Sequence, residues 1–198
     1  MAIVPDAVFT AYLQNETGIT DAAVLSAAKA AAEGQVRQWC QRSFELTNTV
    51  ATARVYGPLQ LRYDGTTVRV GDFTDTASLI VSNYGTTVAS TSYQLEPLNG
   101  INLAGDIVPF EQIRLISSVW TTTSLNQATI TITAKWGWTV VPDPVIEAVK
   151  MLGKDYITAR GSKFGFVETV VGPLAGGRNW MVINALGPYR RSEAFGLA

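Results

Sequence analysis

The pattern of apolar residues changes twice along this chain of 198 residues. Residues 1–44 and 142–160 repeat apolar side chains with the 3.6-residue period of helices, whereas residues 45–138 are rich in Thr, Val, Ile and Tyr, with Gly, Asn and Asp at short intervals. Neither helical segment can bury its apolar face alone. The sequence therefore predicts that the two ends of the chain pack together and that the middle folds as an insertion.

Capping residues delimit the expected helices. Pro5 and Asp6 suit the first turn of a short helix that stops near residues 15–18, and Thr20 and Asp21 suit the cap of a long helix over residues 20–42. A further helix is expected over residues 142–160. Its apolar stripe consists of Val145, Val149, Leu152 and Tyr156. We expect these last two helices to pack against each other.

The middle of the chain has the spacing of short antiparallel strands. The expected strands are residues 48–56, 59–63, 66–71, 77–83, 92–96, 112–118 and 127–138. In the last of them Ile130, Ile132, Ala134, Trp136 and Trp138 alternate with polar residues, as a half-buried strand requires. The chain is therefore predicted to be an α+β protein. A helical domain (1–44 and 139–198, with a flexible C-terminal tail) carries a β insertion (45–138) that forms a small barrel or sandwich.

Composition argues against most enzyme classes. The chain has no histidine and one cysteine, Cys40, so it lacks the residues for a Ser/His/Asp or Cys/His nucleophile and for a zinc cluster. A lone cysteine also favours assembly in a reducing compartment. The first residues lack the pattern of a signal peptide, and no run of 18 apolar residues is present to span a membrane. We expect no enzyme activity, no cofactor, no bound metal and no membrane partner.

Two other functions stay open at this point. Trp136 and Trp138 could stack on a sugar in a carbohydrate-binding tail or baseplate module, although a Trp-Gly-Trp at the end of an alternating strand is more often part of a core. Carboxylates such as Asp72 and Asp75 could serve a hydrolase, although each lies close to turn-forming residues.

The order of several short motifs carries a family resemblance. A long helix ending in WCQRSF is followed by a β region, by SYQLEP, by KWGWTVVPDPVIEAVKMLGKDYI and by LGPYRR near the end of the chain. In this order the motifs resemble the head-tail connector proteins of long-tailed bacteriophages, which are also called adaptor or head-completion proteins. The matching residues are Trp39, Cys40, Arg42 and Phe44, then residues 93–97, 136–142 with the following helix, and 188–191.

The resemblance implies a structural role in a virion. Such proteins form a ring, typically of twelve copies, that docks beneath the portal of a filled head and extends the DNA channel toward the tail. The implied partners are the portal protein, other copies of this chain, and the next connector or tail-terminator protein. DNA would pass through the lumen without sequence specificity. The implied location is the head-tail junction of the virion, after assembly in the cytoplasm of the host bacterium.

Three groups of residues are candidates for these contacts. The small side chains of the long helix suit lateral packing of copies, or equally the subunit's own core: Ala27, Ala28, Ala31 and Ala32. The C-terminal segment either docks on the portal or folds back on its own helices, through Trp180, Met181, Ile183, Leu186, Tyr189, Arg190 and Arg191. Residues 146–198 contain seven basic and four acidic residues, so Lys163 and Arg178 are weak candidates for the DNA channel.

Overall fold

The computed structural model describes residues 2–47, 49–101, 105–122, 127–161 and 180–191. These residues form two compact units. The helical unit comprises residues up to 45 and from 141 to 191, and the β unit comprises residues 46–140. Each unit is described by itself below.

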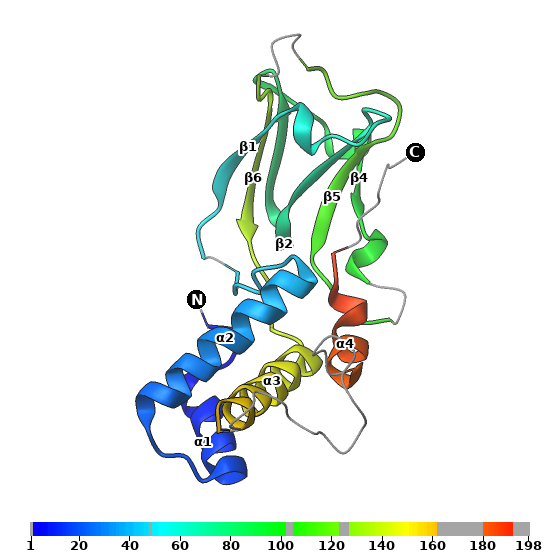
Figure 1. Ribbon diagram of the computed structural model, residues 1–198. Helices are drawn as coiled ribbons and strands as arrows, with labels where there is room; N and C mark the ends of the chain where they lie inside the picture. The colour runs from blue at the N-terminus through cyan, green and yellow to red at the C-terminus, as the bar shows by residue number, and fades with distance from the viewer. Residues whose placement is uncertain (1, 48, 102–104, 123–126, 162–179, 192–198) are drawn as a thin grey trace. The chain divides into compact units, whose positions relative to one another are not determined.

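The helical unit is built from both ends of the chain. Its helices are α1 (Asp6–Thr17), α2 (Ala22–Cys40), α3 (Asp143–Gly161) and α4 (Trp180–Leu186), and a 3₁₀ turn over Gly187–Tyr189 follows α4. Helix α3 packs against α2, α1 and α4 (Figure 1). The predicted packing of the two long helices is therefore confirmed.

Local chemistry fixes the ends of α1 and α2. Gly18 closes α1 in the left-handed conformation, with φ of 69°, and its N–H donates to the carbonyl of Gln14 at 2.9 Å. The Asp21 carboxylate accepts hydrogen bonds from the first free N–H groups of α2, those of Ala23 at 2.8 Å and Val24 at 3.3 Å. The buried Glu33 then anchors the segment before α1, because its carboxylate accepts the N–H of Ile3 at 2.8 Å.

Helix α3 approaches α1 closely at a glycine. A Cβ on Gly153 would lie 2.5 Å from Cζ of Phe9, whose ring is buried. The buried stripe of α3 includes Val145, Ala148, Val149 and Ile157. The prediction that Tyr156 belongs to this stripe is wrong: its side chain is 41% exposed, because Gly153 and Ile157 occupy the face that turns inward.

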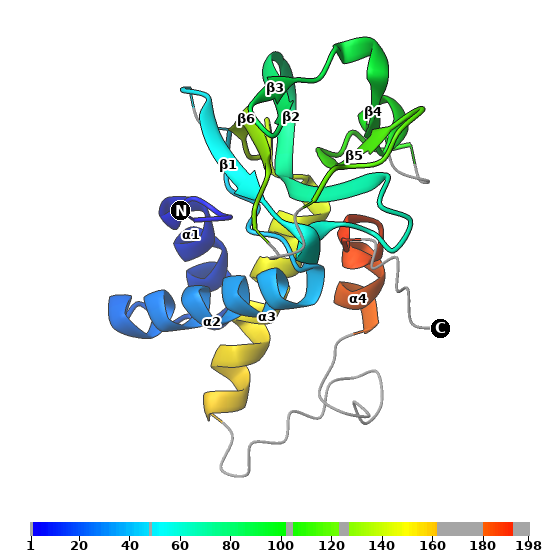
Figure 2. The ribbon, with the colours of Figure 1, turned by 90° about the horizontal axis from the view of Figure 1, so that it is seen from above.

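The β unit contains one antiparallel sheet. Its strands are β1 (Thr52–Tyr56), β2 (Thr67–Asn83), β3 (Thr86–Thr87), β4 (Tyr93–Glu96), β5 (Phe110–Leu115) and β6 (Ile130–Trp136). The strand order is β1-β6-β2-β5-β4, and β3 pairs with the end of β2. Seen from above, the strands bend around a common interior (Figure 2).

The long strand β2 belongs to both halves of this sheet. Its residues 67–73 pair with β5, and its residues 73–83 pair with β6, with irregular register around Phe73 and Asp75. The two strands predicted at 66–71 and 77–83 are therefore parts of one strand. The strand predicted at 59–63 is wrong, because Pro58–Gln60 form a 3₁₀ turn and Leu61 makes a single bridge to Val68.

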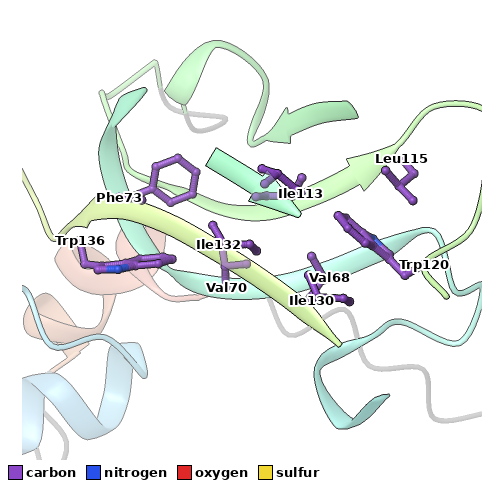
Figure 3. Close-up of a cluster of buried hydrophobic side chains, with 11 residues drawn as sticks. Val68, Val70, Phe73, Ile113, Leu115, Trp120, Ile130, Ile132 and Trp136 are labelled. Carbon is purple, nitrogen blue, oxygen red and sulfur yellow. The ribbon is translucent and has the colours of Figure 1, made fainter. Parts of the chain in front are cut away.

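Side chains from both halves of the sheet fill its interior (Figure 3). The predicted alternation of β6 is confirmed, since Ile130, Ile132, Ala134 and Trp136 are all buried. Phe73 lies edge-on to the Trp136 ring, with 5.8 Å between ring centroids. Trp120 and Leu115 lie at the other end of the cluster.

The glycine contact in the helical unit yields a stability prediction. Gly34 lies inside α2, and in the described part of the chain no packing neighbour comes within 4 Å of where its Cβ would lie, so Gly34→Ala should stabilise the protein by about 0.5–1 kcal/mol. Gly153→Ala should instead destabilise it, because displacing the buried Phe9 ring costs about 1–3 kcal/mol, more than helix preference returns. Chemical denaturation measures both changes. Equal stabilisation of the two variants would contradict the close contact.

Candidate interaction surfaces

The four alanines of α2 do not share one surface. Ala28 and Ala32 are buried in the helical unit, at 0% and 2% exposure, whereas Ala27 is exposed and Ala31 is half-buried. Residues four apart lie on one face of a helix, and this face is turned to the chain's own core. The prediction of subunit packing is therefore corrected for Ala28 and Ala32, and Ala27 and Ala31 stay candidates.

The end of the described chain is folded onto its own helical unit. Leu186 and Tyr189 are buried, at 1% and 4% exposure. The buried Arg42 side chain donates from Nε to the carbonyl of Tyr189 at 2.8 Å. The N–H of Arg191 donates to the carbonyl of Cys40 at 2.9 Å. The alternative in which this segment folds back on its own helices is the one that the structure contains.

Arg190 adds one more contact between the C-terminal segment and the end of α2. The Arg190 guanidinium lies over the Trp39 ring, 5.3 Å from its centroid. Burial raises the pKa of the Cys40 thiol to about 12, so the thiol stays protonated and unreactive at neutral pH. The portal-docking prediction is therefore corrected for Leu186 and Tyr189, which are buried in the subunit, whereas the exposed Arg190 and the half-buried Arg191 stay candidates.

One part of the segment does face outward. Trp180 and Met181, in the first turn of α4, are 58% and 53% exposed, and Ile183 is half-buried. We call these three residues the α4 surface. A large exposed aromatic side chain beside exposed apolar neighbours is the composition of a protein-binding anchor. Lys163 and Arg178 lie outside the described residues.

The positions of the two tryptophans in the β unit contradict the sugar-binding interpretation. Trp136 and Trp138 are 3% and 1% exposed, so neither ring offers a face for stacking. The indole N–H of Trp136 donates to the carbonyl of Thr52 at 2.8 Å, and that of Trp138 donates to the Asp72 carboxylate at 3.0 Å. Both tryptophans are core residues.

The carboxylates considered for a hydrolase have structural partners. Asp72 accepts the Trp138 indole, and Asp75 forms an ion pair of 2.7 Å with Lys135. The hydrogen bond from Lys135 lowers the pKa of Asp75. Within the described ranges, no group of three or more His, Cys, Asp or Glu residues could hold a metal ion, and no helix there has the length and apolar character needed to cross a membrane.

Sequence reasoning missed an exposed surface on the β unit. On the outer face of the β1-β6-β2 half, register places Val55 beside Thr131 and Ser82, and Ala53 beside Thr133 and Ile80. Val55 is 60% exposed and Ile80 is 54% exposed. We call these six residues the uncharged sheet patch. The alternating sequence of β6 predicts that its threonines face outward. The residues that lie beside them on β1 and β2 depend on strand pairing, which the local sequence does not predict.

Comparisons with known proteins find similarity in the fold. No protein-family model matches the sequence, and no curated protein matches it. The solved structure "Neck of empty GTA particle computed with C6 symmetry" contains a chain with 17% identity and a TM-score of 0.53, covering 98% of this chain and 92% of that chain. In "Neck of native GTA particle computed with C12 symmetry" the values are 16% and 0.51, with 98% and 94% covered.

A third similar chain comes from "Virion of native gene transfer agent (GTA) particle", with 15% identity, a TM-score of 0.53, and 98% and 92% covered. The predicted α+β fold class is confirmed: this is a fold found in neck structures of gene transfer agent particles. The resemblance to head-tail connectors is thereby confirmed at the level of the fold.

The anchoring of the C-terminal segment yields a second prediction. Arg42→Ala should lower the free energy of unfolding by about 1–3 kcal/mol, because it removes a buried donor and leaves the Tyr189 carbonyl without that hydrogen bond. Arg62→Ala, at an exposed turn of the β unit, should change it by no more than about 0.5 kcal/mol. Denaturant unfolding compares the two variants. Similar small effects for both would show that Arg42 does not stabilise the segment.

Proposed function

We propose that this protein is a structural virion protein, without enzyme activity, that joins a filled head to a tail as a ring beneath the portal. The observation that carries the proposal is the fold, which is similar over 98% of the chain to neck components of gene transfer agent particles. Partnered carboxylates and buried tryptophans favour this role over the hydrolase and the carbohydrate-binding module.

The proposed assembly is a closed ring of this chain, with twelve copies. The symmetry of the similar necks, C6 and C12, supports this number. A closed cyclic ring needs two different patches on each subunit, because each copy contacts its neighbours through opposite sides. Ala27 and Ala31 on α2 are proposed as part of one such patch.

The proposed partner of the α4 surface is the portal protein. Trp180 and Met181 are exposed on a helix whose opposite side is held by buried contacts, so the surface is already ordered before binding. The next connector or tail-terminator protein would bind elsewhere on the ring. The proposed site of action is the head-tail junction of the virion, reached after assembly in the host cytoplasm.

Electron microscopy of the purified protein, with and without rings of the portal from the same particle, tests the assembly. The proposal expects closed rings that stack coaxially on the portal. Subunits that neither form rings nor bind portal rings would overturn it.

Portal binding should depend on the exposed tryptophan. Trp180→Ala should leave the melting temperature unchanged and weaken portal binding by about thirtyfold or more, the loss typical of an interface hot spot. The matched control is Tyr156→Ala, which removes another exposed aromatic ring from the same unit. Binding assays with immobilised portal rings measure both. An equal, small loss for both variants would remove the α4 surface from the interface.

DNA should pass through the ring without being recognised. The isolated subunit is expected to bind duplex DNA weakly and in a strongly salt-dependent way, because contacts to phosphates from residues such as Lys163 and Arg178 carry no sequence information. Titrations at several salt concentrations with two unrelated sequences test this. A footprint on one defined sequence at physiological salt would contradict it.

A further inference from the structure

The sheet of the β unit has two free edges in the part of the chain that the structure describes. Strands β1 and β4 stand at opposite ends of the order β1-β6-β2-β5-β4, and each pairs with one neighbour. An edge strand leaves alternate N–H and C=O groups unpaired, which makes it a template for another strand. The two edges are different, as a head-to-tail contact between copies requires.

Both edge strands are short, but each is regular and carries only one charged side chain. Strand β1 pairs with β6 through five consecutive residues without a bulge, and it contains neither lysine nor proline. Strand β4 pairs with β5 through four consecutive residues, and its proline comes only after Glu96. The charged side chain of β1, Arg54, turns back over its own sheet, with its guanidinium 4.4 Å from the centroid of the Trp136 ring.

The outer side chains of the two edges favour a contact between unlike strands. Strand β4 carries one anion on its outer face, Glu96, which lies 3.7 Å from Arg114. A β4–β4 contact would bring two of these anions together across the strands, which destabilises pairing. The outer side chains of β1, Ala53 and Val55, are uncharged, so a β1–β4 contact brings no like charges together on this face.

The surface next to β1 also suits contact with protein. The uncharged sheet patch begins at this edge with Ala53 and Val55 and continues across β6 to Ile80. The β4 side differs, because Tyr93 and Leu95 pack on the core and leave Gln94 and Glu96 on the outer face. A contact at the β1 edge would therefore cover exposed apolar side chains as well as pair backbone groups.

We infer that β1 of one copy pairs with β4 of the next copy, so that the sheets of adjacent subunits join edge to edge. This inference rests on the proposed ring and names a contact within it. The occupant of the β1 edge is a second copy of this chain.

A charge introduced at the β1 edge tests the contact. Val55→Glu places an anion on an exposed, outward position of the edge strand, on the same face as Glu96 of the β4 strand that it would meet. The fold should be kept, whereas the concentration for half-assembly of rings should rise about tenfold or more, because like charges across paired strands repel. The matched control is Val50→Glu, at another exposed valine outside the strands, which should assemble as the wild type does. Circular dichroism checks the fold of both, and light scattering and electron microscopy measure assembly.

Cysteine crosslinking identifies the partner edge. The native Cys40 is buried, and burial raises its pKa to about 12, so a short bis-maleimide reacts with introduced cysteines alone. A variant with both Ala53→Cys and Gln94→Cys should give a ladder of covalent oligomers, whereas neither single variant should do so. The two positions lie on the outer sides of β1 and β4.

The outcomes separate this inference from the proposed function. A ladder from the double variant, together with impaired assembly of Val55→Glu, supports the β1–β4 contact. Normal rings from Val55→Glu without a ladder overturn the contact and leave the proposed ring intact. Crosslinked dimers from Ala53→Cys alone overturn it in favour of a β1–β1 pair. Wild-type protein that forms no ring, even on portal rings, overturns both proposals.

Discussion

The contact between α2 and α3 is the constraint on which the rest of this structure depends. In the sequence, α2 comes before the β unit and α3 comes after it. The packing of these two helices therefore closes a loop of chain that contains the whole sheet. The entropy cost of loop closure rises slowly with length, and a long insertion is therefore tolerated. Ala28 and Ala32 of α2 and Val145 and Val149 of α3 are all buried in the helical unit, and side chains as small as alanine let helix backbones come close. The β unit is consequently attached to the helical unit at both of its ends.

Features that depend on local chemistry could be predicted from the sequence. The cap at Asp21, the stop at Gly18 and the alternation of β6 each need only a few consecutive residues, and all three are present. The long strand β2 could not be predicted, because it changes partner from β5 to β6 near Phe73 and carries polar residues where the register is irregular. The buried Asp72 finds its partner in the Trp138 indole, far along the chain, which no local pattern reveals.

The candidate site also depends on contacts between residues that are far apart in the sequence. The sequence left two possibilities open for the C-terminal segment, docking on the portal or folding back on its own helices, and composition could not decide between them. The structure supplies Arg42, Trp39 and the Cys40 carbonyl from the end of α2, and these groups hold the residues after α4. Leu186, on the interior side of α4, was therefore wrongly assigned to the portal interface, and the exposed side of α4 is the part that a partner protein can reach.

Because α4 is already folded in the subunit, the entropy cost expected for its binding to a partner is smaller. A segment that folds only on its partner must lose its conformational entropy at the moment of binding, which weakens the affinity for a given contact area. Helix α4 is held by Val182, Leu186 and Tyr189 before any partner arrives, so that cost is already met in the subunit. The regular edges β1 and β4 are ordered in the same way by their neighbours in the sheet. Contacts between such prefolded surfaces can be small and still specific, because the free energy of each contact goes into association and not into folding.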